Sequence, residues 1–174
     1  VAQNSNYVTV DGEFDSLEKR SFLTIDDYKL EGKTVILRID INSSINPENG
    51  DLLDDTRIKR HSATVKELAE MKAKVIILAH QSRPGKLDFV SLEKHGERMS
   101  EIIDKKITFI DDLYGNRAIN HIKKLENGDI LLLDNVRFDK EEIELNSFED
   151  NNFDKQNTSE MVKKLSQYAS YFVN

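Results

Sequence analysis

The sequence predicts an α/β domain of the three-layer, Rossmann-like kind, a parallel sheet with helices on both faces. Two observations lead to this fold class. Continuous apolar runs of strand length recur along the chain, and segments with helical spacing of apolar residues separate them. Alternating strands and helices are typical of a parallel sheet, and strands without a polar face are typical of a sheet covered on both sides.

The first half of this pattern is regular. Residues 34–40 form a β-branched apolar run suited to a buried strand. Residues 57–71 carry apolar side chains at helical spacing, and residues 54–56 offer an N-cap, so we expect a helix here. Residues 74–79 are predicted to form the next strand.

The second half continues the alternation. Ser91 is predicted to cap a helix that runs to residue 103, and a short strand is expected at 107–110. A helix at 116–125 should stop at the Asn-Gly pair that follows it, a common helix-end signal, before a strand at 129–133.

The remaining segments are less regular. Residues 139–157 are acidic and rich in Asn, which predicts a long surface loop, with the Glu141–Glu142 pair on a solvated face. A helix at 158–168 and a strand at 170–174 are expected to follow. We interpret residues 1–21 as a polar extension or a cloning remnant, with one short strand at 7–10, and residues 22–174 as a single domain. Because the chain stops directly after a strand, we expect a further domain to be missing from it.

Composition narrows the function classes. The chain has 174 residues, a formal net charge of -7 and a pI near 5.2, which disfavours general binding to nucleic acid or an anionic membrane. It has no cysteine, and its four histidines lack metal-ligand spacing. No apolar run approaches the roughly 20 residues of a membrane span, and no signal peptide is evident. A cytoplasmic location is therefore expected, with no metal site on this chain.

Cationic side chains follow the three strongest strands. Arg38 ends the first, His80 and Arg83 follow the second, and Arg137 follows the third. Because ligands bind outside the carboxyl ends of parallel strands, these groups should share one edge of the sheet. A small, dense positive site on an acidic protein calls for a small anionic ligand.

The neighbouring residues fit such a ligand. Because side chains alternate along an extended strand, Arg38, Asp40 and Asn42 should point to the same side. The planar guanidinium of an arginine suits a carboxylate or phosphate, and Asp and Asn side chains suit hydroxyl groups. A structural Arg–Asp pair at the strand end explains this motif about equally well. Arg57, taken alone, is best explained as a helix-start residue paired with Asp54 or Asp55.

Two further patterns weigh against other chemistry. The acidic pairs Asp54–Asp55 and Asp111–Asp112 could indicate a metal site. They are better explained as carboxylates at helix starts, where the helix dipole favours negative charge. The chain contains neither a GxxxxGK[ST] phosphate loop nor a GxGxxG motif after a strand. A phosphoryl-transfer enzyme built from it would need another domain for the phosphoryl donor.

Four motifs together resemble one family. They are VILRIDIN at Val35–Asn42, DDTRI at Asp54–Ile58, AHQSRP at Ala79–Pro84 and DNVRFDKEE at Asp134–Glu142. In this order and spacing, from about Phe22 to Asn174, they resemble the amino-terminal domain of phosphoglycerate kinase, in its archaeal form. Most bacterial and eukaryotic members carry Val-Pro where this chain has Ser43 and Ser44.

The resemblance implies a function and a set of site residues. It implies a glycolytic and gluconeogenic kinase whose amino-terminal domain binds 3-phosphoglycerate or 1,3-bisphosphoglycerate, and whose carboxy-terminal domain binds Mg-ATP or Mg-ADP. Arg57 corresponds to the catalytic arginine, and the substrate-binding positions are Arg38, Asp40, Asn42, His80, Arg83 and Arg137. One further arginine of the family's patch lies beyond Asn174. We expect this chain alone to bind substrate, to hold no cofactor and to be inactive.

Two other classes remain open from the residues. The first alternative is a non-catalytic Rossmann-like module that binds a phosphorylated metabolite. A receiver-type phospho-acceptor domain is a distant third, because its strand ends would need an acidic pocket where this chain has cations.

Overall fold

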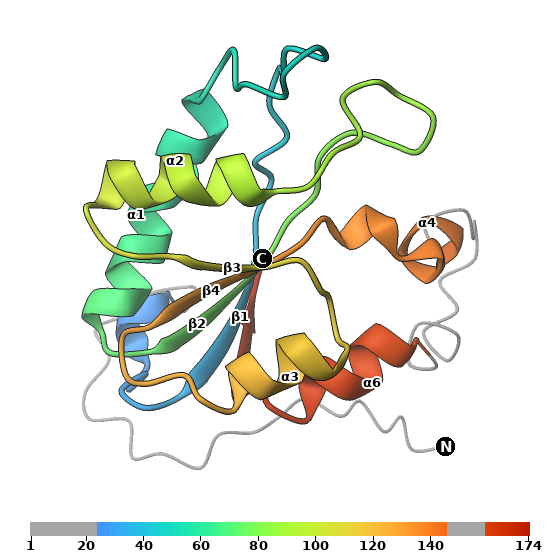
Figure 1. The fold of residues 1–174 in the computed structure, drawn as a ribbon. Coiled ribbons are helices and arrows are strands. Elements are labelled where there is room, and N and C mark those ends of the chain that lie inside the picture. The colour runs from blue at the N-terminus through green and yellow to red at the C-terminus, as the bar shows by residue number, and fades with distance from the viewer. Residues whose placement is uncertain (1–23, 146–158) are drawn as a thin grey trace, which may run out of the picture.

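The computed structural model describes residues 24–145 and 159–174, and it contains a single five-stranded sheet in this part of the chain (Figure 1). All strand pairs are parallel, and the strand order is β3-β4-β2-β1-β5. The strands are β1 (Thr34–Arg38), β2 (Lys74–Leu78), β3 (Thr108–Ile110), β4 (Ile130–Leu133) and β5 (Tyr171–Val173). The predicted parallel α/β fold is thereby confirmed.

Helices cover both faces of the sheet (Figure 1). On one face lie α1 (Thr56–Glu70) and α2 (Glu93–Ile103), and on the other lie α3 (Asn116–Ile122) and α6 (Glu160–Ser166). Three short elements complete the described part: η1 (Ile25–Asp27), η2 (Val136–Phe138) and α4 (Lys140–Leu145). None of the helices described is both long and apolar enough to cross a membrane.

Alternation along the strands divides the core into two clusters. Val35 and Leu37 of β1 pack with α1 and α2, whereas Ile36 between them packs on the side of α3 and α6. The central strand β2 is buried from Val75 to Leu78, and β4 is buried throughout. The continuous apolar runs in the sequence therefore reflect strands that need apolar side chains on both faces.

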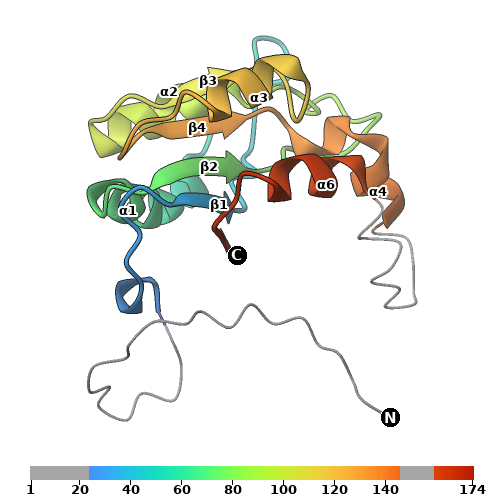
Figure 2. The ribbon, with the colours of Figure 1, turned by 90° about the horizontal axis from the view of Figure 1, so that it is seen from below.

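The loops that follow β1, β2 and β4 stay together beyond the sheet. The amide of Ile39 donates to the carbonyl of Leu78 over 3.0 Å, and the amide of Val136 donates to the carbonyl of Ala79 over 3.0 Å. Figure 2 shows α4 beyond the carboxyl ends of the strands. This edge is the one that the sequence predicted to hold the cationic residues.

Several boundaries differ from the sequence prediction. The predicted surface loop at 139–157 is wrong for its first part, because residues 140–145 form α4; the Asp139 carboxylate accepts the Glu141 amide at 3.0 Å, which starts this helix. The helix expected at 116–125 ends at Ile122, and α2 begins two residues after Ser91, whose hydroxyl accepts the Glu93 amide. The strand expected at 7–10 lies outside the described residues.

Candidate functional site

Arg57 on the first turn of α1 faces the loop after β1. Its guanidinium pairs with the Asp40 carboxylate, and both side chains are about half exposed. Asp40 also accepts the Asn42 amide at 3.0 Å. Burial would raise the pKa of Asp40, but the Asn42 amide and Arg57 outweigh burial and lower it. Asp40 is therefore an anion at neutral pH.

The expected local pairing of Arg57 with Asp54 or Asp55 does not form. The Asp54 carboxylate accepts the amide and hydroxyl of Thr56, and Asp55 pairs with Lys59 and Arg98. Because Asp54 and Asp55 have these other partners, Arg57 pairs instead with Asp40 in the loop after β1.

Arg38 at the end of β1 pairs with Glu142 of α4. Glu142 is only 12% exposed and Arg38 is 35% exposed, so this pair is more shielded from water than the pair of Arg57 and Asp40. The expectation that Glu142 lies on a solvated face is wrong. The acidic run after Phe138 carried no pattern that marked one of its members as a partner for Arg38.

His80 is half-buried and lies within electrostatic range of these charges. Burial lowers its pKa below the usual value, and the positive charges of Arg137 and Arg38 act in the same direction. Asp40 and Glu142 act in the opposite direction. The imidazole is therefore mostly neutral at pH 7, and charged groups from β1, α4 and the loops after β1 and β4 act on it.

A backbone unit at Ser82 links two more candidates. Its amide donates to the Asn42 side-chain oxygen at 2.9 Å, and its carbonyl accepts from the Arg137 guanidinium. Ser82 has a φ of 56°, in the left-handed region that few non-glycine residues adopt. The loop after β2 thus lies between the loops after β1 and β4.

Arg83 stands apart from the other predicted residues. It is exposed, and within residues 24–145 and 159–174 its side chain makes no hydrogen bond or ion pair. The loop that carries it is closed by the Ser82 hydroxyl, which donates to Asp88 at 2.6 Å. The other six candidates are linked to one another by contacts or by electrostatic interaction: Arg38, Asp40, Asn42, Arg57, His80 and Arg137.

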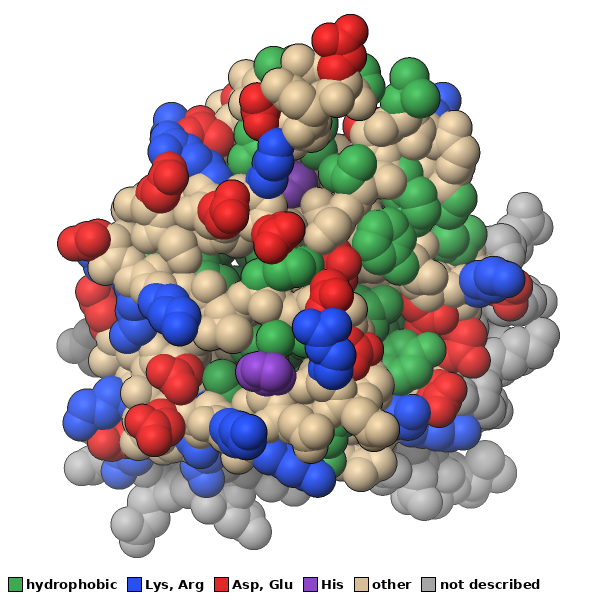
Figure 3. All heavy atoms as spheres, in the orientation of Figure 1, with side chains coloured by type: hydrophobic (Ala, Val, Ile, Leu, Met, Phe, Trp, Pro, Cys, Tyr) green, Lys and Arg blue, Asp and Glu red, His purple; other side chains and the backbone are tan. Residues whose placement is uncertain are grey.

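Charges of both signs are mixed on one face of the molecule. On the face seen in Figure 3, basic and acidic side chains are interspersed. This face carries no broad basic field, so the candidate cations are distinguished by their position at the strand ends.

The acidic pair Asp111–Asp112 serves the start of α3. Asp112 accepts the amides of Leu113, Gly115 and Ala118 at 2.8–3.0 Å, and Asp111 pairs with Arg117. This confirms the helix-start interpretation. In the part of the chain that the structure describes, no group of three His, Asp or Glu side chains is arranged to hold a metal ion.

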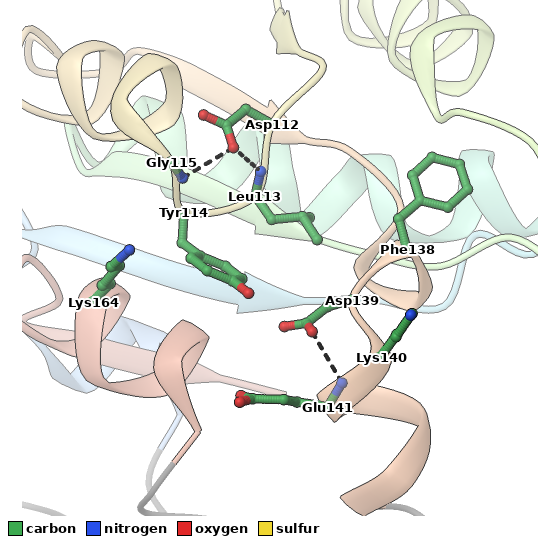
Figure 4. Close-up of a pocket in the computed structure, with 9 residues that line it drawn as sticks. All are labelled: Asp112, Leu113, Tyr114, Gly115, Phe138, Asp139, Lys140, Glu141 and Lys164. Atoms are coloured by element: carbon green, nitrogen blue, oxygen red, sulfur yellow. Dashed lines mark hydrogen bonds between the residues drawn. The ribbon is translucent and has the colours of Figure 1, made fainter.

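A cavity of about 520 Å³ lies between α3, η2, α4 and α6 (Figure 4). Burial and then the negative charge of Asp139 raise the pKa of Tyr114, and the Lys164 ammonium lies 5.2 Å from the centre of the Tyr114 ring. None of the predicted site residues lines this cavity. It is separate from the cationic site.

Fold and site together define a Rossmann-like α/β domain with cationic groups at the carboxyl edge of its parallel sheet. Residues 25–174 match the family model described as phosphoglycerate kinase, and the chain belongs to this family.

Relatives with this name support the assignment. The chain is 51% identical to a phosphoglycerate kinase from Methanococcus maripaludis over 88% of its own length and 37% of the relative's. It is 46% identical to that of Methanobacterium bryantii over 88% and 36%. The crystal structure of phosphoglycerate kinase from Pyrococcus horikoshii OT3 superposes with a TM-score of 0.79 at 33% identity, over 88% of this chain and 36% of that one. The chain thus spans little more than a third of the proteins it matches.

Proposed function

We propose that this domain is the 3-phosphoglycerate-binding half of a phosphoglycerate kinase, within residues 22–174. The observation that carries the proposal is the group of cations around His80 at the carboxyl ends of β1, β2 and β4. The intact protein would transfer a phosphoryl group reversibly between ATP and the carboxylate of 3-phosphoglycerate, giving ADP and 1,3-bisphosphoglycerate.

The residue types suit that reaction. A carboxylate nucleophile is already ionised at neutral pH, so the site needs no strong base. It needs charges that hold two anionic groups close together, which arginines provide. Arg38, Arg83, Arg137 and the neutral His80 would form the basic patch that holds the substrate, with Asp40 and Asn42 at its carboxylate and hydroxyl end.

Arg57 would have a different role. Its side chain is half exposed, and its pairing with Asp40 is weakly held because exposed ion pairs contribute about 1 kcal/mol or less. It can therefore leave Asp40 and contact the phosphoryl group during transfer. Mg-ATP or Mg-ADP would be the co-substrate bound by a carboxy-terminal domain, so this chain alone would bind substrate without turnover.

Two measurements test the proposal. Titration calorimetry with 3-phosphoglycerate should show binding to this chain, and a coupled kinase assay should show turnover only after a separately produced carboxy-terminal domain is added. Arg57→Ala should lower that turnover by about 10³-fold or more while changing the Kd by less than about threefold. Arg60→Ala, exposed on the same helix, is the matched control. Absence of binding, or turnover by this chain alone, would contradict the proposal.

A further inference from the structure

The side chain of Gln81 joins two of the strand-end loops from inside the protein. It is fully buried, its oxygen accepts the Ser43 amide at 2.9 Å, and its nitrogen donates to the Ser43 carbonyl at 2.9 Å. The Gln81 side-chain amide hydrogen-bonds the amide and the carbonyl of Ser43, as the backbone of a neighbouring strand would do within a sheet. It fixes the loop after β1 against the loop after β2.

His95 of α2 holds the same amide from the other side. Its Nε2 lies 3.1 Å from the Gln81 oxygen, and only 1% of the residue is exposed. Because the Ser43 amide fixes that oxygen as an acceptor, Nε2 must carry the proton. Nδ1 then carries none, and it has no hydrogen-bond partner. The neutral ring is a donor dedicated to orienting the Gln81 amide.

Asn135 extends the network to the third loop. It is fully buried, its nitrogen donates to the Gln81 carbonyl at 2.8 Å, and its oxygen accepts the Arg137 amide at 3.2 Å. The residue after Gln81 is Ser82, whose backbone bonds Asn42 and Arg137. A shift of the Gln81 backbone therefore moves contacts of two candidate ligand-binding side chains.

We infer that Gln81 and His95 are positioning residues, which set Asn42 and Arg137 for the anionic ligand without touching it themselves. The inference deepens the proposed function and rests on it for the identity of the ligand. A buried side-chain amide is costly unless its oxygen and nitrogen both have partners, and when both are satisfied it holds one arrangement. Gln81 satisfies both backbone groups of Ser43, whose side chain is bonded to the Ile41 carbonyl.

The first test is Gln81→Met, which keeps the shape of the side chain and removes its hydrogen bonds. Hydrogen exchange of the ligand-free domain should become about fivefold faster or more at the Ser43 amide, which loses its acceptor, and faster at the Ser82 amide. The Kd for 3-phosphoglycerate should rise by about tenfold. The control is Gln167→Met, at an exposed glutamine at the end of α6. It should change neither the exchange rates of the Ser43 and Ser82 amides nor the Kd.

The second test separates positioning from general stability. His95→Leu should weaken binding severalfold, and His95→Gln, whose amide can still donate to Gln81, should restore most of it. Because His95 is inferred to act only through Gln81, His95→Leu should have no further effect on the Kd in the Gln81→Met protein. Additive effects would overturn the inference. Should a His95 variant not fold, the Gln81→Met comparison decides by itself.

The outcomes distinguish this inference from the proposed function. If the natural domain does not bind 3-phosphoglycerate, the proposed function fails, and the exchange measurements still test the network. If Gln81→Met accelerates exchange at Ser43 while Ser82 and the Kd stay unchanged, Gln81 has a structural role only and the inference is wrong.

Discussion

The ion pair between Arg38 and Glu142 places a carboxylate at a cation that the ligand is proposed to use. An anionic ligand must displace or share this partner. Glu142→Gln keeps the size of the side chain and its hydrogen-bonding capacity and removes the competing charge. We therefore expect the variant to bind 3-phosphoglycerate more tightly.

The exposure of the two groups sets the magnitude. Two unit charges about 4 Å apart attract by about 1 kcal/mol in water and by about 4 kcal/mol at an effective dielectric constant of 20. Arg38 is 35% exposed, so solvent screens the pair and the lower figure applies. A gain of about 1 kcal/mol corresponds to a Kd about fivefold lower.

Titration calorimetry at low ionic strength measures this change, and added salt should reduce the gain. Glu70→Gln, at the far end of α1, alters the total charge equally without touching the site and should leave the Kd nearly unchanged. An unchanged or higher Kd for Glu142→Gln would refute the reasoning that Glu142 competes with the ligand.

Three further predictions concern stability, each measured by urea unfolding. Burial lowers the pKa of His95 to about 4, so between pH 6.5 and 4 the histidine is protonated in the unfolded state but not in the folded state. The free energy of unfolding should therefore fall by about 2 kcal/mol between pH 7 and 5, and it should fall less in His95→Gln. Gly96→Ala should cost about 1–2 kcal/mol despite its better helix propensity, because the new Cβ would lie 2.9 Å from Leu132 Cδ2 in the buried core. Asp112→Ala should cost about 1–2 kcal/mol because three amides lose their acceptor, and no loss would contradict its capping role.

The sheet could be predicted because its strands carry a strong signal. Strands covered on both faces need unbroken apolar runs, which stand out in the sequence at 34–40, 74–79 and 129–133. Helix α4 could not be predicted in the same way. A six-residue helix with one turn and a half has little apolar periodicity, and α4 depends on the Asp139 carboxylate and on the distant partner Arg38.

The grouping of the candidate residues could be predicted from the sequence, but their ion-pair and hydrogen-bond partners could not. The rule that ligands bind at the carboxyl ends of parallel strands gave the edge on which six candidates lie together. Pairings such as Arg57 with Asp40 join residues 17 positions apart, and nearer carboxylates offered a plausible alternative. Gln81 was unremarkable in sequence because a glutamine between a histidine and a serine looks like a polar loop residue.

The ion pairs at the site differ in how easily a ligand can break them. The four arginines of the site carry four positive charges, and Asp40 and Glu142 carry two negative charges, so the local net charge is 4 - 2 = +2. Because the whole chain has a formal charge of -7, long-range attraction of an anionic ligand is weak. Affinity must then come from short-range geometry, which the buried network around Gln81 supports. The pair of Arg57 and Asp40 is more exposed than the pair of Arg38 and Glu142, so it is the easier of the two to open. This asymmetry suits one arginine that moves to the transferring group and another that stays fixed at the strand end.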